Sequence, residues 1–261
     1  MRSVSQFFGF ARDPSRAEKT GFVSYTQGDA TKATDITAFI ETVRPTHILN
    51  LLGLFRGDFE KLMAVNVMAS RTLCETALRP GMTVKRIVLT GSAAEYGLNA
   101  INPVQEDATL QPVSNYGLAK VCQSVLANYY FRNFMLPTIV ARTFNISGEG
   151  LSPELSLGNF ARQIQALANG GSIKVGNLST SRDFLPIMEV CRRYWVLLMK
   201  GVPGEVYNIC SGKPVTMRAM LDKMILESGK SVAVETDPAL FKDNDAACIY
   251  GDGSKFAALE T

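Results

Sequence analysis

Short apolar runs alternate with helical patterns along residues 1–145, and this alternation limits the possible folds more than any other feature of the sequence. The pattern predicts strands at 4–11, 46–53, 85–92 and 136–145, and helices at 34–43, 58–78 and 115–134. Thr34 is the expected N-cap of the first helix. Near-continuous apolar strands separated by helices are typical of a parallel sheet with helices on both faces. The sequence therefore predicts a doubly wound α/β fold.

The pattern changes after residue 145. Helices are expected at 157–171, 189–201 and 216–229, and short strands at 173–177 and 204–212. The sequence contains no obvious repeat, low-complexity tract or linker. We therefore expect the second region to form a smaller α/β cap that packs against the sheet.

Composition and charge exclude several classes of protein. The chain has 261 residues, 46% of them hydrophobic, which is enough to bury a large core. Its apolar stretches are too short to span a bilayer and its start lacks the pattern of a signal peptide, so we expect a cytoplasmic protein with no membrane partner. Five scattered cysteines and one histidine predict reduced thiols and no metal site. The net charge of +3 is spread without a basic run, which argues against a nucleic-acid partner.

Polar residues follow several predicted strands. In doubly wound sheets the ligand lies beyond the carboxyl ends of the strands, so these positions are candidates for binding. They are Arg12 with Asp13, Gly53, Ser92 and Asn145. An arginine after such a strand favours the 2′-phosphate of NADP, whereas an acidic residue there favours the ribose of NAD.

The segment "SNYGLAK" (114–120) places Tyr116 four residues before Lys120, at the start of a predicted helix. Residues at this spacing are neighbours on a helix, either as a chemical pair or as two solvated side chains. With Ser92 at the end of a buried strand, the three residues suit hydride transfer to a carbonyl. Tyrosine hydroxyls ordinarily have a pKa of about 10, and a neighbouring ammonium favours the ionised form. Ser92 would hold the substrate oxygen against Tyr116.

Seven segments in this order resemble one family: "GDATK", "NVMAS", "SAAEYG", "YGLAK", "ARTFNISGEG", "SRDF" and "PGEVYNICSG". The sequence is similar to the extended short-chain dehydrogenase/reductase family of nucleotide-sugar epimerases, dehydratases and reductases, which have a Rossmann-like fold. From "ARTFN" through "PGEVYNICSG" it looks most like the reductases of GDP-4-keto-6-deoxy-mannose.

The resemblance implies roles for individual residues. Ser92, Tyr116 and Lys120 would be catalytic. The cofactor, NADP or NAD, would be bound by Arg12, Asp29, Gly53, Asn66, Tyr116 and Lys120. Ser92, Asn145 and Arg182 would bind the nucleotide-sugar substrate. Residues 1–145, with contributions from about 182–212, would form the cofactor-binding domain and residues 146–261 mainly the substrate-binding cap, and we expect a homodimer.

Simpler interpretations stay open for the supporting residues. Asn66 could be an ordinary helix-face amide, Arg182 could form a structural ion pair with Asp183, and Asn145 could cap a turn. Dehydratases of this family carry an acidic pair directly after the catalytic hydroxyl residue. Here Ala93 and Ala94 occupy those positions and Glu95 comes one place later, which argues against dehydration.

The family pattern also begins with a strand and a glycine-rich loop that binds the cofactor pyrophosphate. Residues 1–10 contain no such loop, so we expect a gap in the sheet between the strands near residues 8 and 88. Either further residues belong to the molecule, for example between Arg2 and Ser3, or the protein is truncated. The leading hypothesis is a reductase of a 4-keto nucleotide sugar. The alternatives are a nucleotide-sugar 4-epimerase and a degenerate cofactor-binding protein with a regulatory or structural role.

Overall fold

The computed structural model describes residues 6–16, 23–98, 101–168, 170–241 and 245–261. The chain divides into two compact units. Unit 1 consists of Met1–Gly91, Ser114–Val140 and Leu197–Glu205, and unit 2 of Ser92–Val113, Ala141–Val196 and Val206–Thr261. The functional division at residue 145 stays a prediction.

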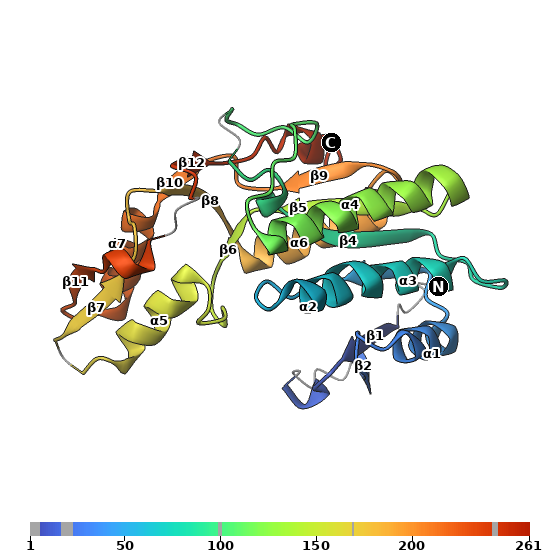
Figure 1. Cartoon of the computed structure of the whole chain (residues 1–261), viewed down its shortest axis with the longest axis horizontal. Helices are drawn as coiled ribbons and strands as arrows, with labels where there is room; N and C mark the ends of the chain where they lie inside the picture. Colours follow the sequence, from blue (N-terminus) through green and yellow to red (C-terminus); the bar gives the residue numbers. More distant parts are fainter. Residues whose placement is uncertain (1–5, 17–22, 99–100, 169, 242–244) are drawn as a thin grey trace. The chain divides into compact units, whose positions relative to one another are not determined.

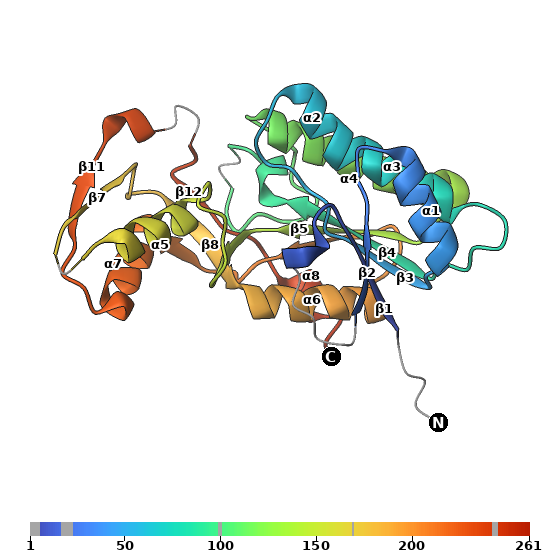
Figure 2. The same ribbon diagram turned by 90° about the horizontal axis from the view of Figure 1, so that it is seen from below.

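Unit 1 contains parallel strands and a layer of helices. Its elements are β1 (Phe7–Ala11), η1 (Pro14–Arg16), β2 (Val23–Gln27), α1 (Ala33–Val43), β3 (His47–Asn50), α2 (Phe59–Met63), η2 (Ala64–Met68), α3 (Ala69–Ala77), β4 (Arg86–Ser92), α4 (Asn115–Phe134) and the start of β5 (Thr138–Thr143). Helix α3 packs between α1 and α4 (Figure 2).

The main sheet has the strand order β3-β4-β5-β9. Strands β3 and β4 are parallel, with Ile48 opposite Ile87. All residues of β5 are buried, as expected for a strand covered on both faces. The predicted α/β class with a parallel sheet is confirmed (Figure 1).

The N-terminal strands differ from the prediction. Strand β2 was not predicted, because "VSYTQ" is largely polar and mostly exposed. It pairs in parallel with β1, and these two strands form a sheet separate from the main sheet. The expected gap was assigned to the wrong neighbour: strand β3, not the strand near residue 88, is the terminal strand of the main sheet, because β4 already pairs with β3. Residues 1–5, including the position between Arg2 and Ser3, lie outside the described residues.

Two helix predictions also need correction. Thr34 is not the N-cap of α1: the helix starts at Ala33 after Lys32, and Asp35 instead accepts a hydrogen bond from the Asp29 N–H at 3.0 Å. The helix predicted at 58–78 consists of α2, the π-helical segment η2 and α3. Within η2 the Asn66 amide donates to the Leu62 carbonyl at 2.9 Å, so a side chain takes up a carbonyl that an α-helix would bond through its backbone.

Unit 2 has its own sheets and hydrophobic core. It contains η3 (Ala93–Glu95), β6 (Asn145–Ser147), α5 (Ser156–Ala166), β7 (Ser172–Val175), β8 (Ser181–Pro186), most of α6 (Ile187–Lys200), β9 (Val206–Ile209), β10 (Pro214–Thr216), α7 (Met217–Ser228), β11 (Ala233–Thr236), η4 (Pro238–Leu240), β12 (Cys248–Ile249) and α8 (Ser254–Ala257). Strand β8 pairs with β6, β10 and β12.

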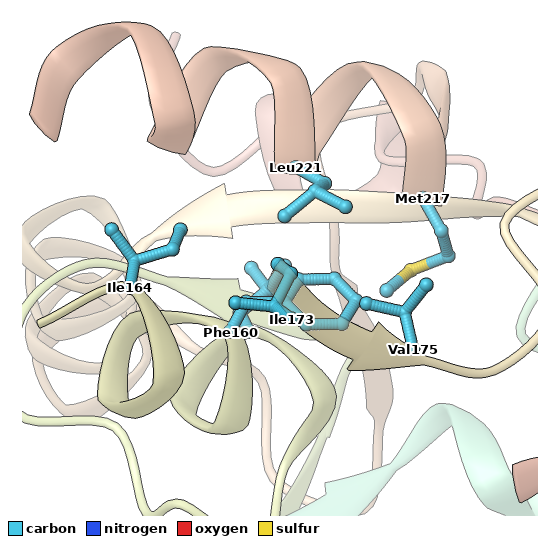
Figure 3. Packing of buried hydrophobic residues seen from close by; sticks show 7 residues of the cluster. Phe160, Ile164, Ile173, Val175, Met217 and Leu221 are labelled. Atoms are coloured by element: carbon cyan, nitrogen blue, oxygen red, sulfur yellow. The ribbon is translucent and has the colours of Figure 1, made fainter. Parts of the chain in front are cut away.

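Helices α5 and α7 enclose β7 in a compact apolar cluster (Figure 3). Phe160 and Ile164 come from α5, Ile173 from β7, and Met217 and Leu221 from α7. Leu221 has no exposed surface. This cluster forms the hydrophobic core of the region that we expect to be the substrate-binding cap.

Candidate active site

The tyrosine and lysine of "SNYGLAK" lie on the first turns of α4, as predicted. Ser114 caps this helix by accepting a hydrogen bond from the Gly117 N–H at 3.0 Å. The Lys120 Nζ lies 5.9 Å from the centroid of the Tyr116 ring. Lys120 is only 2% exposed, so it is not a solvated surface lysine.

Two neutral acceptors hold the Lys120 ammonium. It donates to the Thr90 carbonyl, near the end of β4, at 2.8 Å, and to Gln123 Oε1 at 2.9 Å. A buried cation without polar partners would cost several kcal/mol or more, so these contacts make its position tenable. The Lys120 Nζ is therefore held inside unit 1, beside Tyr116.

Gly53 and Asn66 lie against the same lysine. A Cβ atom on Gly53 would be 3.8 Å from Lys120 Nζ and 3.7 Å from Asn66 Oδ1. Asn66 is fully buried, accepts from the Leu54 N–H at 3.2 Å and donates to the Leu54 carbonyl at 2.8 Å. The Asn66 amide thus satisfies backbone groups of Leu54 and Leu62, as the simpler interpretation expects, and its part in cofactor binding stays a prediction. Gly53, Asn66, Tyr116 and Lys120, predicted from separate motifs, are close together in unit 1.

Arg12 and Asp29 follow two paired strands. Ala11 of β1 lies opposite Gln27 of β2, so the two strands end at the same edge of their sheet. The pKa of Asp29 is lowered, first because the Thr31 N–H donates to its carboxylate at 2.9 Å, and to a smaller extent by the charge of Arg12. Asp13 accepts from the Ser15 N–H at 3.1 Å, so its carboxylate supports the short helix η1.

Ser92 belongs to unit 2, where a buried ion pair fixes its turn. The Ser92 hydroxyl accepts from the Ala94 N–H at 3.2 Å, and the Ser92 N–H donates to Glu95 at 2.8 Å. The side chains of Ser92 and Glu95 each accept from the backbone N–H of the other residue, which makes a capping box. Glu95 is fully buried and forms an ion pair with Arg142 at 2.8 Å. Burial is the largest single influence and lowers the pKa of Arg142, but the interactions with Glu95 and Tyr96 together outweigh it, so the pKa is raised. Glu95 therefore has a structural role in this turn.

Asn145 and Arg182 lie on paired strands of unit 2. Asn145 of β6 is opposite Phe184 of β8, and Arg182 lies two residues before Phe184, on the same face of β8. Arg182 forms an ion pair with Asp245 and donates to the Ser181 carbonyl at 2.7 Å. The simpler interpretation of Arg182 as a member of an ion pair is therefore confirmed, but its partner is Asp245 and not Asp183.

Asp183 has a different role in the same unit. It is buried, and its carboxylate accepts from the Ser211 N–H at 2.6 Å and from the Gly212 N–H at 2.9 Å. It thus fixes the chain after β9, leaving Arg182 to pair with an acid far along the sequence.

The polar residues behind Lys120 were not predicted from the sequence. Gln123, Ser70, Asn50 and Thr90 are buried and hydrogen-bonded around it. The available signal was spacing: Gln123 follows Lys120 by three residues and Ser70 follows Asn66 by four, which places each pair on one helix face.

In the described part of the chain, no group of three or more His, Cys, Asp or Glu side chains is placed to hold a metal ion. None of the helices formed by the described residues is long and apolar enough to cross a membrane.

Comparison with known proteins identifies relatives of this chain. The model of the "NAD dependent epimerase/dehydratase family" matches residues 5–210. GDP-6-deoxy-D-mannose reductase of Pseudomonas aeruginosa is 25% identical over 81% of this chain and 72% of its own length. GDP-6-deoxy-D-talose 4-dehydrogenase of Aggregatibacter actinomycetemcomitans is 23% identical over 87% of this chain and 77% of its own length.

Solved structures share the fold. RMD from Pseudomonas aeruginosa complexed with NADPH has a TM-score of 0.84 and 20% identity, covering 98% of this chain and 92% of that one. UDP-glucuronic acid 4-epimerase from Bacillus cereus, in complex with UDP-glucuronic acid and NAD, has a TM-score of 0.85 and 20% identity, covering 99% and 85%.

The Glu95–Arg142 pair predicts a large loss of stability on substitution. Arg142→Ala leaves a buried carboxylate without its ion-pair partner and should lower the free energy of unfolding by about 3–5 kcal/mol. Urea denaturation followed by circular dichroism measures this. The matched control is Arg218→Ala, which breaks an exposed pair with Asp222 and should cost about 1 kcal/mol or less. Equal effects of the two substitutions would contradict a structural role for Glu95.

Proposed function

The chain belongs to the NAD dependent epimerase/dehydratase family, and on this premise we propose that it reduces a 4-keto nucleotide sugar with NADPH or NADH. The observation that carries the proposal is the pairing of Tyr116 with a buried lysine ammonium, 5.9 Å from its ring. A buried cation at this place favours the loss of a proton from a neighbouring hydroxyl, which is what a proton donor to a carbonyl needs.

Residues at Lys120 and at the ends of β1 and β2 suit the two ends of a nicotinamide cofactor. Gly53 has no side chain at the point where a Cβ atom would contact Lys120 and Asn66. Lys120 and Tyr116 would bind near the nicotinamide ribose, and Arg12 and Asp29, at one sheet edge, near the adenosine. The cofactor supplies the hydride for the carbonyl carbon. Solved relatives of the fold contain NADPH or NAD.

The chain's own residues would supply the proton and orient the substrate. Tyr116 donates its hydroxyl proton to the carbonyl oxygen as that oxygen gains negative charge. Lys120 stabilises the resulting phenolate. Ser92, on a turn fixed by Glu95, holds the carbonyl oxygen through its hydroxyl.

We infer that the sugar nucleotide is a GDP-sugar and that Asn145 and Arg182 bind it. Two relatives in the same family are named for GDP-6-deoxy sugars, which supports guanosine as the base. A guanidinium binds phosphate oxygens in a bidentate manner, so Arg182 suits the diphosphate. A 4-epimerase is the second candidate, because it would use the same three catalytic residues and one structural neighbour is a UDP-sugar epimerase.

We also propose a homodimer. Leu118 is 40% exposed and Val125 is 61% exposed, and at seven residues apart they lie on one face of α4. A second copy of this chain would cover this apolar face. Sedimentation equilibrium that returned the mass of a monomer at micromolar concentration would contradict it.

Tyr116→Phe should abolish turnover and leave nucleotide binding nearly unchanged. The substitution removes the proton donor but keeps the ring, so the loss falls on kcat and should be about a hundredfold or more. Steady-state kinetics with NADPH measure it. Tyr129→Phe, on the exposed part of the same helix, is the matched control. A Tyr116→Phe variant with more than about a tenth of the wild-type kcat would remove Tyr116 from the proton-donor role.

Arg12→Ala should reduce the preference for NADPH over NADH. We expect the ratio of the two kcat/KM values to fall about tenfold, because one charge-assisted contact to the 2′-phosphate is lost. The ratio is measured on wild type and variant under the same conditions. An unchanged ratio would show that Arg12 does not contact the phosphate.

Arg182→Ala should weaken GDP binding by roughly thirty- to a hundredfold, because a bidentate arginine contact to phosphate contributes about 2–3 kcal/mol. Calorimetric titration with GDP and UDP measures both affinity and base preference. Arg162→Ala, which removes an exposed arginine of α5, serves as the control. Equal GDP affinity of wild type and Arg182→Ala would limit Arg182 to its ion pair with Asp245, and a preference for UDP would favour the epimerase.

A further inference from the structure

A continuous buried hydrogen-bond network leads away from Lys120 into unit 1. Gln123 accepts from Lys120 Nζ through Oε1 and donates from Nε2 to the Ser70 hydroxyl at 2.8 Å. Ser70 in turn donates to the Asn66 carbonyl at 2.8 Å and accepts from Asn50 Nδ2 at 3.0 Å. These groups come from β3, from the adjacent segments η2 and α3, and from α4.

Ser70 fixes the direction of the whole network. A hydroxyl has one proton to donate and two lone pairs to accept with. The Ser70 proton goes to the Asn66 carbonyl, so the hydroxyl can only accept from the amides of Asn50 and Gln123. Gln123 must therefore direct its NH₂ group to Ser70 and its oxygen to Lys120.

The network reaches α4 on the helix face that carries Tyr116 and Lys120. Tyr116, Lys120 and Gln123 have the spacing i, i+4 and i+7, which places them in one row along the helix. Lys120 Nζ is held from the other side by the Thr90 carbonyl. Both acceptors are uncharged, so they fix the position of the ammonium without cancelling its charge.

Burying these polar side chains contributes little to stability, which indicates a role other than stabilising the fold. Gln123 is 1% exposed, and Ser70 and Asn66 have no exposed surface. Burial of polar side chains contributes little net stability even when they are hydrogen-bonded, and apolar side chains of similar size would pack there at no desolvation cost. A fully paired polar network instead specifies one arrangement of the groups at its end. Here that group is the Lys120 ammonium.

We propose that Gln123, oriented by Ser70, is a positioning residue that holds the Lys120 ammonium beside Tyr116. The proposal rests on the proposed function for its effect on catalysis, but the placement of the ammonium is a property of the protein alone. Gln123 contacts Lys120 and acts on the reaction only through it.

The placement is tested directly by proton-nitrogen correlation NMR of the lysine ammonium groups, without substrate or cofactor. A buried, hydrogen-bonded ammonium exchanges its protons slowly enough to be observed, and Lys120→Met identifies its signal. We expect Gln123→Leu to shift or broaden that signal. Gln163→Leu is the matched control, because Gln163 also uses both ends of its amide, with the backbone of Lys174, and lies on α5. An unchanged Lys120 signal in Gln123→Leu would overturn the proposal.

Gln123→Glu keeps the shape and the acceptor oxygen and provides a variant that folds if Gln123→Leu does not. A carboxylate beside the ammonium should shift the Lys120 signal strongly while leaving it slow to exchange, and an unchanged signal would again overturn the proposal.

Kinetics separate this proposal from the proposed function. Gln123→Leu should lower kcat about ten- to a hundredfold with little change in the KM for the nucleotide sugar, because a displaced ammonium affects the transition state and not ground-state binding. A wild-type protein without hydride-transfer activity would refute the proposed function, and the NMR result would still decide the role of Gln123. Normal kcat in a variant whose Lys120 signal has moved would refute the catalytic importance of the placement.

Discussion

The burial of one ammonium group, that of Lys120, is the constraint on which unit 1 depends. A cation with 2% exposure needs polar partners in fixed positions, because burial without them would be prohibitively costly. The partners are a carbonyl of β4 and a side chain of α4, and the network behind them extends to β3, η2 and α3. Two strands, the π-helical segment and two helices are therefore joined by one hydrogen-bond network that ends at Lys120.

Unit 2 also contains a buried charged group that holds a candidate catalytic residue in place. The buried Glu95–Arg142 pair fixes the turn of Ser92 through the backbone N–H of that residue. Arg142 also donates to the Tyr96 hydroxyl, and burial raises the pKa of Tyr96 to about 12, so this hydroxyl stays protonated. Tyr96 in turn donates to Asn208. In each unit a buried charge with a complete set of partners fixes one of the groups expected to act on a carbonyl.

The sequence predicted what short-range patterns determine. Helix α4 begins and ends where its periodicity predicted, and the strand-helix alternation predicted the α/β class. The residues at Gly53, Asn66, Tyr116 and Lys120 were found from motifs, and the structure places them together. Strand β2 was missed because its side chains are polar, and Gln123 and Ser70 were missed because a buried polar residue has the same helical spacing as an exposed one. The partner of Arg182 was wrong because Asp245 is close only in three dimensions.

The central claim is that the site on α4 transfers a hydride to a keto sugar and a proton to its oxygen. It is tested most directly by incubating the protein with GDP-4-keto-6-deoxy-mannose and NADPH that carries deuterium at both C4 positions of the nicotinamide, followed by mass spectrometry of the sugar nucleotide. The account predicts a reduced product with deuterium at sugar C4 and an equal amount of oxidised cofactor. No incorporation of deuterium by the wild-type protein, with the keto sugar unchanged, would contradict it.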